Sequence, residues 1–296
     1  MRLNKFFLSA LFLVSSFGVM AQNYLLNAKS PDEITDKGIE DIMAEADGPV
    51  PYPHINENDI LFSKIVWETI PLDERANLIY YYPEVATENR KPLFNVLIDA
   101  IKNKDITEIY DNSNFDYKLS YEDISSKFTR TDTVDEGKVQ LMMEGTVDPQ
   151  YILTRTLNPT DVVEYKIKGI WYFDRNAGEL KYRILGIAPV AYDANSKLLP
   201  ESQREPTELF WLFYPDPNVR NVMFSNYAFN EKNPRKKINF DYLFNARRFS
   251  ATIYKVENIQ DATISEQVGE DAWFQLMEAE RIKEGIRNME DDLWSN

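Results

Sequence analysis

Residues 162–188 read VVEYKIKGIWYFDRNAGELKYRILGIA, and this stretch decides the fold class. Apolar and charged side chains alternate up to residue 173, which is the period of a half-buried β-strand. The next five residues, Asp174 to Gly178, are typical of a turn, and alternation resumes over 179–188. The stretch therefore predicts a β-hairpin. Its apolar face carries Val163, Tyr165, Ile167, Trp171, Phe173, Leu180, Tyr182, Ile184 and Ala188, opposite Glu164, Lys166, Lys168, Lys181 and Arg183.

Shorter patterns on both sides of this hairpin add helices and further strands. Pro92, followed by apolar residues at steps of three and four, predicts a helix over 92–103, and Ser120 with Asp123 predicts a capped helix. This order of elements favours an α+β fold, with N-terminal helices, a central antiparallel sheet and a long C-terminal helix. We also expect helices over 57–69 and 239–248, an extended aromatic segment at 80–83, a central strand over 208–214, and strands over 221–227 and 249–256.

The chain ends in a predicted amphipathic helix over residues 268–294. Apolar side chains recur there at steps of three and four, so one face is expected to pack on the core or on a neighbouring subunit. Acidic side chains outnumber basic ones in this segment, so the opposite face is anionic. The apolar stripe comprises Trp273, Leu276, Ala279, Ile282, Ile286, Met289 and Leu293.

Composition excludes several kinds of chemistry. The chain has 296 residues with no cysteine and one histidine, which excludes disulfides, thiolate metal sites and multi-histidine metal sites. The formal net charge of −15 disfavours nucleic acids and anionic membrane surfaces as partners. No glycine-rich phosphate-binding motif occurs, and His54 lies in a proline-rich segment that would orient it poorly. We predict no catalytic, metal-binding or cofactor-binding residues.

The first 21 residues have the pattern of a secretory signal peptide. Arg2 and Lys5 precede an apolar stretch over 6–19, and Ala21 is a suitable residue before a cleavage site. We therefore expect a periplasmic chain, attached to a membrane only through a partner because no cysteine follows for a lipid anchor. Residues 22–56 are expected to be flexible, with a proline-rich arm over 48–54 that lies along the domain or reaches a neighbouring chain.

Basic clusters and surplus aromatic residues are the candidate contact sites. The clusters at 235–237 and 247–248 either balance local charge or dock an acidic neighbour, for which the C-terminal helix of another copy is a candidate. Most aromatic side chains should be in the core, and the rest are suited to an interface or a carbohydrate platform. The candidate interface residues are Tyr52, His54, Trp67, Tyr81, Tyr82, Arg235, Lys236, Lys237, Arg247, Arg248 and Trp294.

Abundant carboxylates leave one alternative open. A periplasmic carbohydrate-binding or carboxylate-dependent hydrolase module needs neither cysteine nor histidine, only two suitably spaced acids. No pair of acids has a recognisable local context in this sequence. The candidate acids are Glu164, Asp174, Glu179, Glu208, Asp216 and Asp241.

Ordered sequence blocks run from about residue 50 to the end of the chain. They are WETIPLDERANLIYYYP (67–83), KGIWYFD (168–174), RILGIAPV (183–190), ELFWLFYP (208–215), NFDYLF (239–244), RRFS (247–250), ERIKE (280–284) and DDLW (291–294). In this order the blocks resemble the GldN/PorN family of type IX secretion and gliding-motility proteins of the Bacteroidetes. Glu68 and Glu164 depart from the usual family pattern, which puts a charge contact with a partner in doubt but not the fold.

The resemblance implies a non-enzymatic periplasmic component with no catalytic residues. Members of the family form a ring-like oligomer with an outer-membrane lipoprotein, GldK/PorK, and contact the inner-membrane motor proteins GldL/PorL and GldM/PorM. The expected organisation is a signal peptide at 1–21, a flexible segment at 22–56, an α+β core at 57–267 and the amphipathic helix at 268–296.

Overall fold

The computed structural model describes residues 48–84, 86–87, 90–192, 204–229 and 237–294. All of them belong to one compact unit, Asp47–Asn296. The predicted signal peptide, most of the flexible segment at 22–56, and the cluster residues Arg235 and Lys236 lie outside the described residues, so the structure does not test them.

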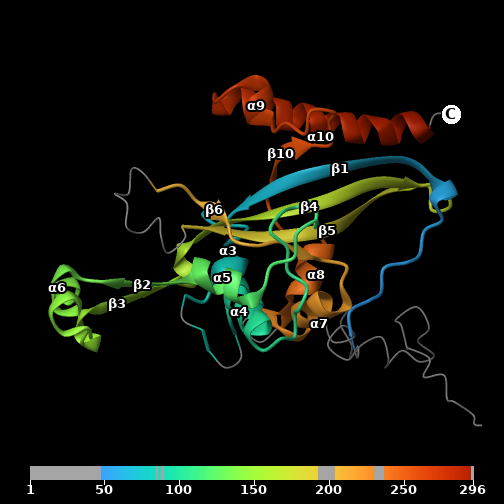
Figure 1. Ribbon diagram of the computed structural model, residues 1–296. Helices are drawn as coiled ribbons and strands as arrows, with labels where there is room; N and C mark the ends of the chain where they lie inside the picture. Colours follow the sequence, from blue (N-terminus) through green and yellow to red (C-terminus); the bar gives the residue numbers. More distant parts are fainter. Residues whose placement is uncertain (1–47, 85, 88–89, 193–203, 230–236, 295–296) are drawn as a thin grey trace, which may run out of the picture. The chain divides into compact units, whose positions relative to one another are not determined.

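A six-stranded antiparallel sheet forms the centre of this unit (Figure 1). Its order is β10-β1-β4-β5-β6, and β7 also pairs with β5. The predicted hairpin is confirmed, with Val162 opposite Ala191 and Asp174 opposite Glu179. The fold is α+β, as predicted. The strands of this sheet are β1 (Ile60–Pro71), β4 (Val162–Asp174), β5 (Glu179–Ala191), β6 (Thr207–Glu208), β7 (Leu212–Phe213) and β10 (Thr252–Val256).

The helix predicted over 57–69 is wrong, because this segment forms strand β1 after the short 3₁₀ turn η2 (Glu57–Asp59). β1 lies between β4 and β10, and both faces of the sheet are covered there, so Val66, Trp67 and Glu68 are buried one after another. Continuous burial hides the strand period, and apolar residues at 60, 61, 65 and 67 then also satisfy a helical spacing.

Five helices cover one face of the sheet and form the largest hydrophobic cluster with it (Figure 1). The predicted helix at 92–103 is confirmed as α4, and the predicted capping box of Ser120 with Asp123 begins α5. The helix predicted over 239–248 is confirmed in part, since it ends at Asn245. The five helices are α3 (Leu78–Tyr81), α4 (Leu93–Lys102), α5 (Tyr121–Phe128), α7 (Pro217–Ser225) and α8 (Phe240–Asn245).

Three other predictions fail on this face. The segment predicted to be extended at 80–83 begins inside helix α3, where the Tyr80 ring packs against Phe244 at 5.0 Å. The strand predicted over 221–227 is mostly helix α7, which Asp216 caps by accepting the Asn218 N–H at 3.0 Å. The strand predicted over 208–214 is not central, because it contributes only to the short strands β6 and β7, which pair with β5 alone.

Two helices near the C-terminus, α9 (Ile264–Val268) and α10 (Ala272–Trp294), pack beside β10 and β1 at the edge of the sheet (Figure 1). Ala279 and Ile286 of α10 are buried against Val66 of β1 and Ile253 of β10. The predicted C-terminal helix is therefore confirmed, although α10 begins at residue 272. The predicted strand over 249–256 is confirmed for its second half, β10.

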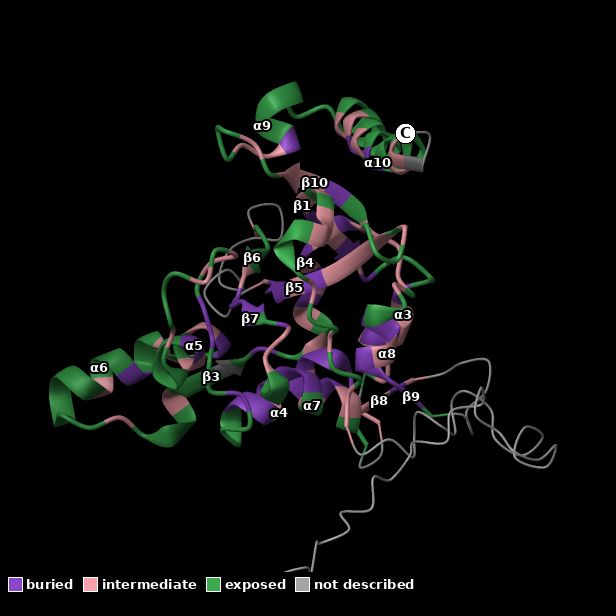
Figure 2. Cartoon of the chain, turned by 90° about the vertical axis from the view of Figure 1, so that its right-hand side faces the viewer, coloured by how far each residue is buried: buried purple, intermediate pink, exposed green. Residues whose placement is uncertain are grey.

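A separate protrusion has no counterpart in the sequence predictions. Two strands, β2 and β3, pair only with each other and hold helix α6, whose residues are mostly exposed (Figure 2). Its sequence is polar and weakly periodic, so local patterns do not reveal it. The elements of the protrusion are β2 (Thr129–Thr133), α6 (Asp135–Glu144), η3 (Pro149–Tyr151) and β3 (Ile152–Thr156). Outside the protrusion, the remaining short elements are η4 (Pro159–Asp161), β8 (Tyr227–Ala228) and β9 (Ile238–Asn239).

Candidate interaction surface

The described residues contain no cluster of three or more side chains suited to hold a metal ion. None of their helices combines the length and the apolar character needed to cross a bilayer. His54, the single histidine, is exposed. Three of the candidate acids for a carboxylate-dependent hydrolase form ion pairs. They are Asp174 with Lys181 at 3.0 Å, Glu208 with Lys166 at 2.9 Å, and Asp241 with Arg220 at 2.8 Å.

One of the predicted contact residues, Arg247, forms an internal ion pair. Its guanidinium donates two hydrogen bonds, at 2.8 and 3.0 Å, to the carboxylate of Glu68, whose side chain is 2% exposed. The Tyr182 hydroxyl donates to the same carboxylate at 2.8 Å, and the guanidinium lies 4.0 Å from the Tyr182 ring centroid. Burial lowers the pKa of Arg247, but the hydrogen bonds and charge of Glu68 outweigh burial and raise it above its usual value.

This pair explains two features of the local backbone. The register between β1 and β10 shifts between Trp67 and Glu68, next to this ion pair. Arg247 has φ of +48°, a conformation that costs a non-glycine residue about 1 kcal/mol. The two hydrogen bonds to Glu68 offset that cost and fix the turn after α8. Arg247 therefore serves the core, although the sequence marked it as a contact residue.

The second buried pair holds the proline-rich arm. Arg220 donates to both carboxylate oxygens of Asp241, at 3.0 and 2.8 Å, and its remaining terminal nitrogen donates to the Val50 carbonyl at 2.6 Å. The Tyr214 hydroxyl donates to Asp241 at 3.0 Å, so every partner in this buried network is satisfied. The arm thus lies along its own domain, the first of the two predicted placements.

Tyr52 sits at the centre of this arm. Its ring lies between two guanidinium groups, 4.4 Å from Arg220 and 4.8 Å from Arg183, and its hydroxyl donates to Asn245 at 2.7 Å. Arg183 also donates to the Pro53 carbonyl at 2.9 Å. Burial raises the pKa of Tyr52 to about 12, against the opposing charge of Arg220. Tyr52 therefore anchors the arm to β5 and α7.

Trp67 is also part of the core. Its side chain is 4% exposed, and its ring is approached by the ammonium groups of Lys168 at 4.9 Å and Lys255 at 4.8 Å. Burial lowers the pKa of Lys168 below its usual value, and the charge of Lys255 adds to the effect. This arrangement leaves little of Trp67 for a partner.

The other predicted contact residues lie on separate parts of the surface. Tyr81 and Tyr82 are partly exposed and pack edge to face at 5.2 Å. Lys237 is exposed above the Tyr227 ring at 5.1 Å, and Arg248 donates to the Tyr242 hydroxyl at 2.8 Å. Trp294 ends α10, and its side chain is not described. The structure does not gather these residues into one site, and their role as contacts stays a prediction.

The strongest candidate surface lies instead at the start of α10. Four large apolar side chains are about half exposed there: Trp273 at 65%, Phe274 at 56%, Met277 at 54% and Leu276 at 46%. Together with Val268 of α9, which is 36% exposed, they form what we call the α10 patch. The predicted stripe includes Trp273 and Leu276 of this patch but not Phe274 or Met277, and the sequence could not show that these residues stay exposed while Ala279 and Ile286 are buried.

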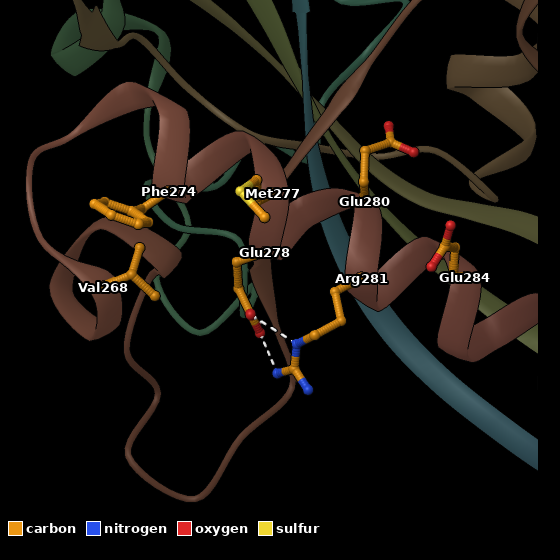
Figure 3. Close-up of a pocket in the computed structure, with 7 residues that line it drawn as sticks. All are labelled: Val268, Phe274, Met277, Glu278, Glu280, Arg281 and Glu284. Atoms are coloured by element: carbon orange, nitrogen blue, oxygen red, sulfur yellow. Dashed lines mark hydrogen bonds and ion pairs between the residues drawn. The ribbon is translucent and has the colours of Figure 1, made fainter.

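A groove runs from the α10 patch along the helix (Figure 3). Its volume is about 650 Å³, and Figure 3 shows Val268, Phe274 and Met277 at one end and Glu280 and Glu284 at the other. Between them, Arg281 donates two hydrogen bonds to Glu278, at 2.8 and 2.5 Å, which lowers the pKa of that carboxyl. The groove thus combines an apolar end with an acidic end.

Helix α6 of the protrusion is a second exposed apolar surface. Met142 is 87% exposed and Met143 is 81% exposed, and Val139 and Leu141 are each about half exposed. An isolated two-stranded hairpin is marginally stable by itself, so the protrusion has little packing of its own to hold α6.

Comparison with known proteins assigns the family. Among curated protein sequences no match is found. The sequence model of one family, described as gliding motility associated protein GldN, matches residues 55–295, which is most of the chain and includes every element from η2 to α10. The matched range contains both the ordered sequence blocks and the exposed α10 patch. The chain belongs to the family of the gliding motility associated protein GldN.

Proposed function

We propose that this chain is a non-enzymatic structural component of the gliding-motility and type IX secretion machinery, acting in the periplasm. It forms a ring-like complex with an outer-membrane lipoprotein of the GldK/PorK kind and contacts motor proteins of the GldL/PorL and GldM/PorM kinds. The family match supports a place in this machinery. The ring, the partners and the compartment extend that assignment and rest on the sequence resemblance and the predicted signal peptide.

The observation that carries an assembly role is the α10 patch. Its Trp, Phe, Leu and Met side chains are adjacent and exposed, although the same helix buries Ala279 and Ile286. Tryptophan, phenylalanine and methionine are enriched in protein interfaces, and contiguous exposed apolar surface on a folded chain marks interaction sites. Burying these side chains against a partner would supply the binding energy that scattered polar contacts do not.

The buried charges of the fold support a structural role in a different way. The carboxylates of Glu68 and Asp241 are saturated by arginine and tyrosine donors. Such saturated pairs fix the geometry of a scaffold but provide no group poised for proton transfer. These two pairs therefore support a structural role for the core.

The test is complementation of a strain that lacks this chain. Wild-type protein should restore gliding and secretion and should co-purify with the GldK-like lipoprotein. The double variant Trp273→Ala, Phe274→Ala should lose both, with an unchanged melting temperature because these side chains are exposed. The matched control, Leu141→Ala with Met142→Ala on α6, removes similar exposed apolar surface elsewhere. Wild-type protein that never associates with the lipoprotein would refute the proposal.

A further inference from the structure

The groove beside the α10 patch has two chemically different ends, and we infer that it binds a basic amphipathic segment of a partner protein. The segment would place an apolar anchor against Val268, Phe274 and Met277 and a lysine or arginine between Glu280 and Glu284. This inference rests on the proposed function, since it names the chemistry of the partner that the same surface would take.

The apolar end offers a contact surface for an apolar side chain. Val268 belongs to α9 and Phe274 and Met277 belong to α10, so two elements form its walls (Figure 3). Phe274 and Met277 are each more than half exposed, although they line a concave surface. Methionine adapts its shape to different occupants, which suits a site that receives a leucine, phenylalanine or methionine from another chain.

The acidic end has an unfavourable charge arrangement that a cation would relieve. Glu280 and Glu284 are one helical turn apart on α10, where like charges destabilise a helix by a few tenths of a kcal/mol. Glu280 is held only by an exposed contact with Lys283 at 3.3 Å, and Glu284 has no ion-pair partner among the described residues. The neighbouring cation, Arg281, is already committed to Glu278. The negative charge of this end is therefore available to a ligand.

The distance between the two ends restricts the sequence of the ligand. The centre of the apolar end lies about two helical turns before the midpoint of Glu280 and Glu284, which is roughly 10 Å at 1.5 Å per residue. A helical ligand lying along α10 would then carry its anchor and its basic residue about seven positions apart. An extended ligand would span the same distance with about three residues.

Charge favours a different chain over a second copy of this one. Two copies that meet through this groove would set each acidic end against the acidic or the apolar end of the other copy, and neither end supplies a cation, in a chain whose net charge is already −15. Among the described basic candidates of a second copy, Arg247 is bound to Glu68 and Arg248 to Tyr242 inside their own chain, and Lys237 is exposed over the Tyr227 ring. The same acidic end also opposes binding to an anionic lipid surface.

Synthetic peptides test the inference on the purified full chain. The probe is an amphipathic helix of about 18 residues, long enough to be helical in water, with phenylalanine and lysine seven positions apart. The control peptide carries glutamate in place of that lysine. Fluorescence anisotropy should show that the probe binds about tenfold more tightly than the control and that added salt reduces the difference.

Two matched variants locate the binding. Glu284→Lys should weaken the probe about tenfold, whereas Glu136→Lys, at an exposed position on α6, should leave it unchanged. Met277→Ala should weaken both peptides, whereas Met142→Ala should weaken neither. Equal affinity for the two peptides, or equal loss in the groove and α6 variants, would overturn the inference. So would concentration-dependent self-association of the chain that Glu284→Lys strengthens, because the occupant would then be a second copy.

Cells separate this inference from the proposed function. If wild-type chain does not associate with the motility machinery at all, the proposed function fails. If the wild-type chain and Glu284→Lys both restore gliding and both co-purify with the GldK-like and GldM-like proteins, the function stands and the basic ligand is excluded. Loss of one of these partners in Glu284→Lys but not in Glu136→Lys supports the inference and identifies which partner carries the basic segment.

Discussion

Replacing Arg247 by methionine is the most informative perturbation of the core. Methionine keeps most of the length and apolar stem of arginine but removes both hydrogen bonds to Glu68. The Glu68 carboxylate, with its side chain 2% exposed, would then keep only the Tyr182 hydroxyl as a donor. Removing one partner of a buried ion pair costs about 3–5 kcal/mol, because an uncompensated charge stays buried. We therefore expect Arg247→Met to lower the unfolding free energy by that amount.

Urea denaturation followed by tryptophan fluorescence and circular dichroism measures this loss. Adding Glu68→Gln to the variant should recover more than half of it, since glutamine carries no charge and still offers an oxygen to Tyr182.

The matched control is Arg281→Met on α10. Arg281 makes the same two-hydrogen-bond contact with a glutamate, but its own side chain is 75% exposed, so water replaces the lost partner. Exposed pairs of this kind contribute about 0–1 kcal/mol. Equal losses in Arg247→Met and Arg281→Met, or a double variant no more stable than Arg247→Met, would refute the reasoning that burial of Glu68 sets the magnitude.

Three further perturbations test other parts of the fold. Gly169→Ala should cost about 1–3 kcal/mol, because a Cβ there collides with the Tyr182 hydroxyl, and an unchanged melting temperature would contradict that close approach. Asn77→Ala should cost about 2–3 kcal/mol in chemical denaturation, since the amide bonds the Pro71 carbonyl and the backbone of Ser250; a loss below about 1 kcal/mol would mean that water replaces it. Tyr52→Phe should remove one phenol that titrates near pH 12 from the absorbance titration. Because the folded pKa exceeds the unfolded value of about 10, the stability linked to Tyr52 should be constant below pH 10 and decline as the pH rises through 12; a phenol that titrates near 10 would place the arm in solvent.

Sequence patterns correctly predicted those helices and strands in which apolar and polar residues recur at a regular spacing. The β4–β5 hairpin alternates along two strands joined by a five-residue turn sequence, so both partners and their connection are read from one continuous stretch. Helix α4 has a proline before its first turn and a regular apolar face. In these elements one face is buried and the other is not, which is the condition under which periodicity carries information.

Prediction failed where both faces of an element are buried or where its contacts are remote. Strand β1 is covered on both sides, so its period disappears and a helical spacing fits equally well. The partners Glu68 and Arg247 are separated by 179 residues, and no local pattern connects them. The sequence predicted the apolar stripe of α10. It could not show which turns of the helix pack on the sheet, because that depends on the position of β10 in the fold. The candidate groove could therefore be found only in the folded chain.

The position of β1 between β10 and β4 has a consequence for when the protein can fold. The β4–β5 hairpin can form as soon as its own residues are available, because its strands are neighbours in the chain. β1 is made earlier, yet one of its two edges waits for β10, with Val66 paired to Val256 and Thr69 to Thr252. Closing so long a loop is slow, and until then an apolar strand edge stays open to other chains. A chain interrupted before residue 252 therefore lacks the strand that completes its sheet, so truncated or stalled products should aggregate rather than accumulate as folded fragments.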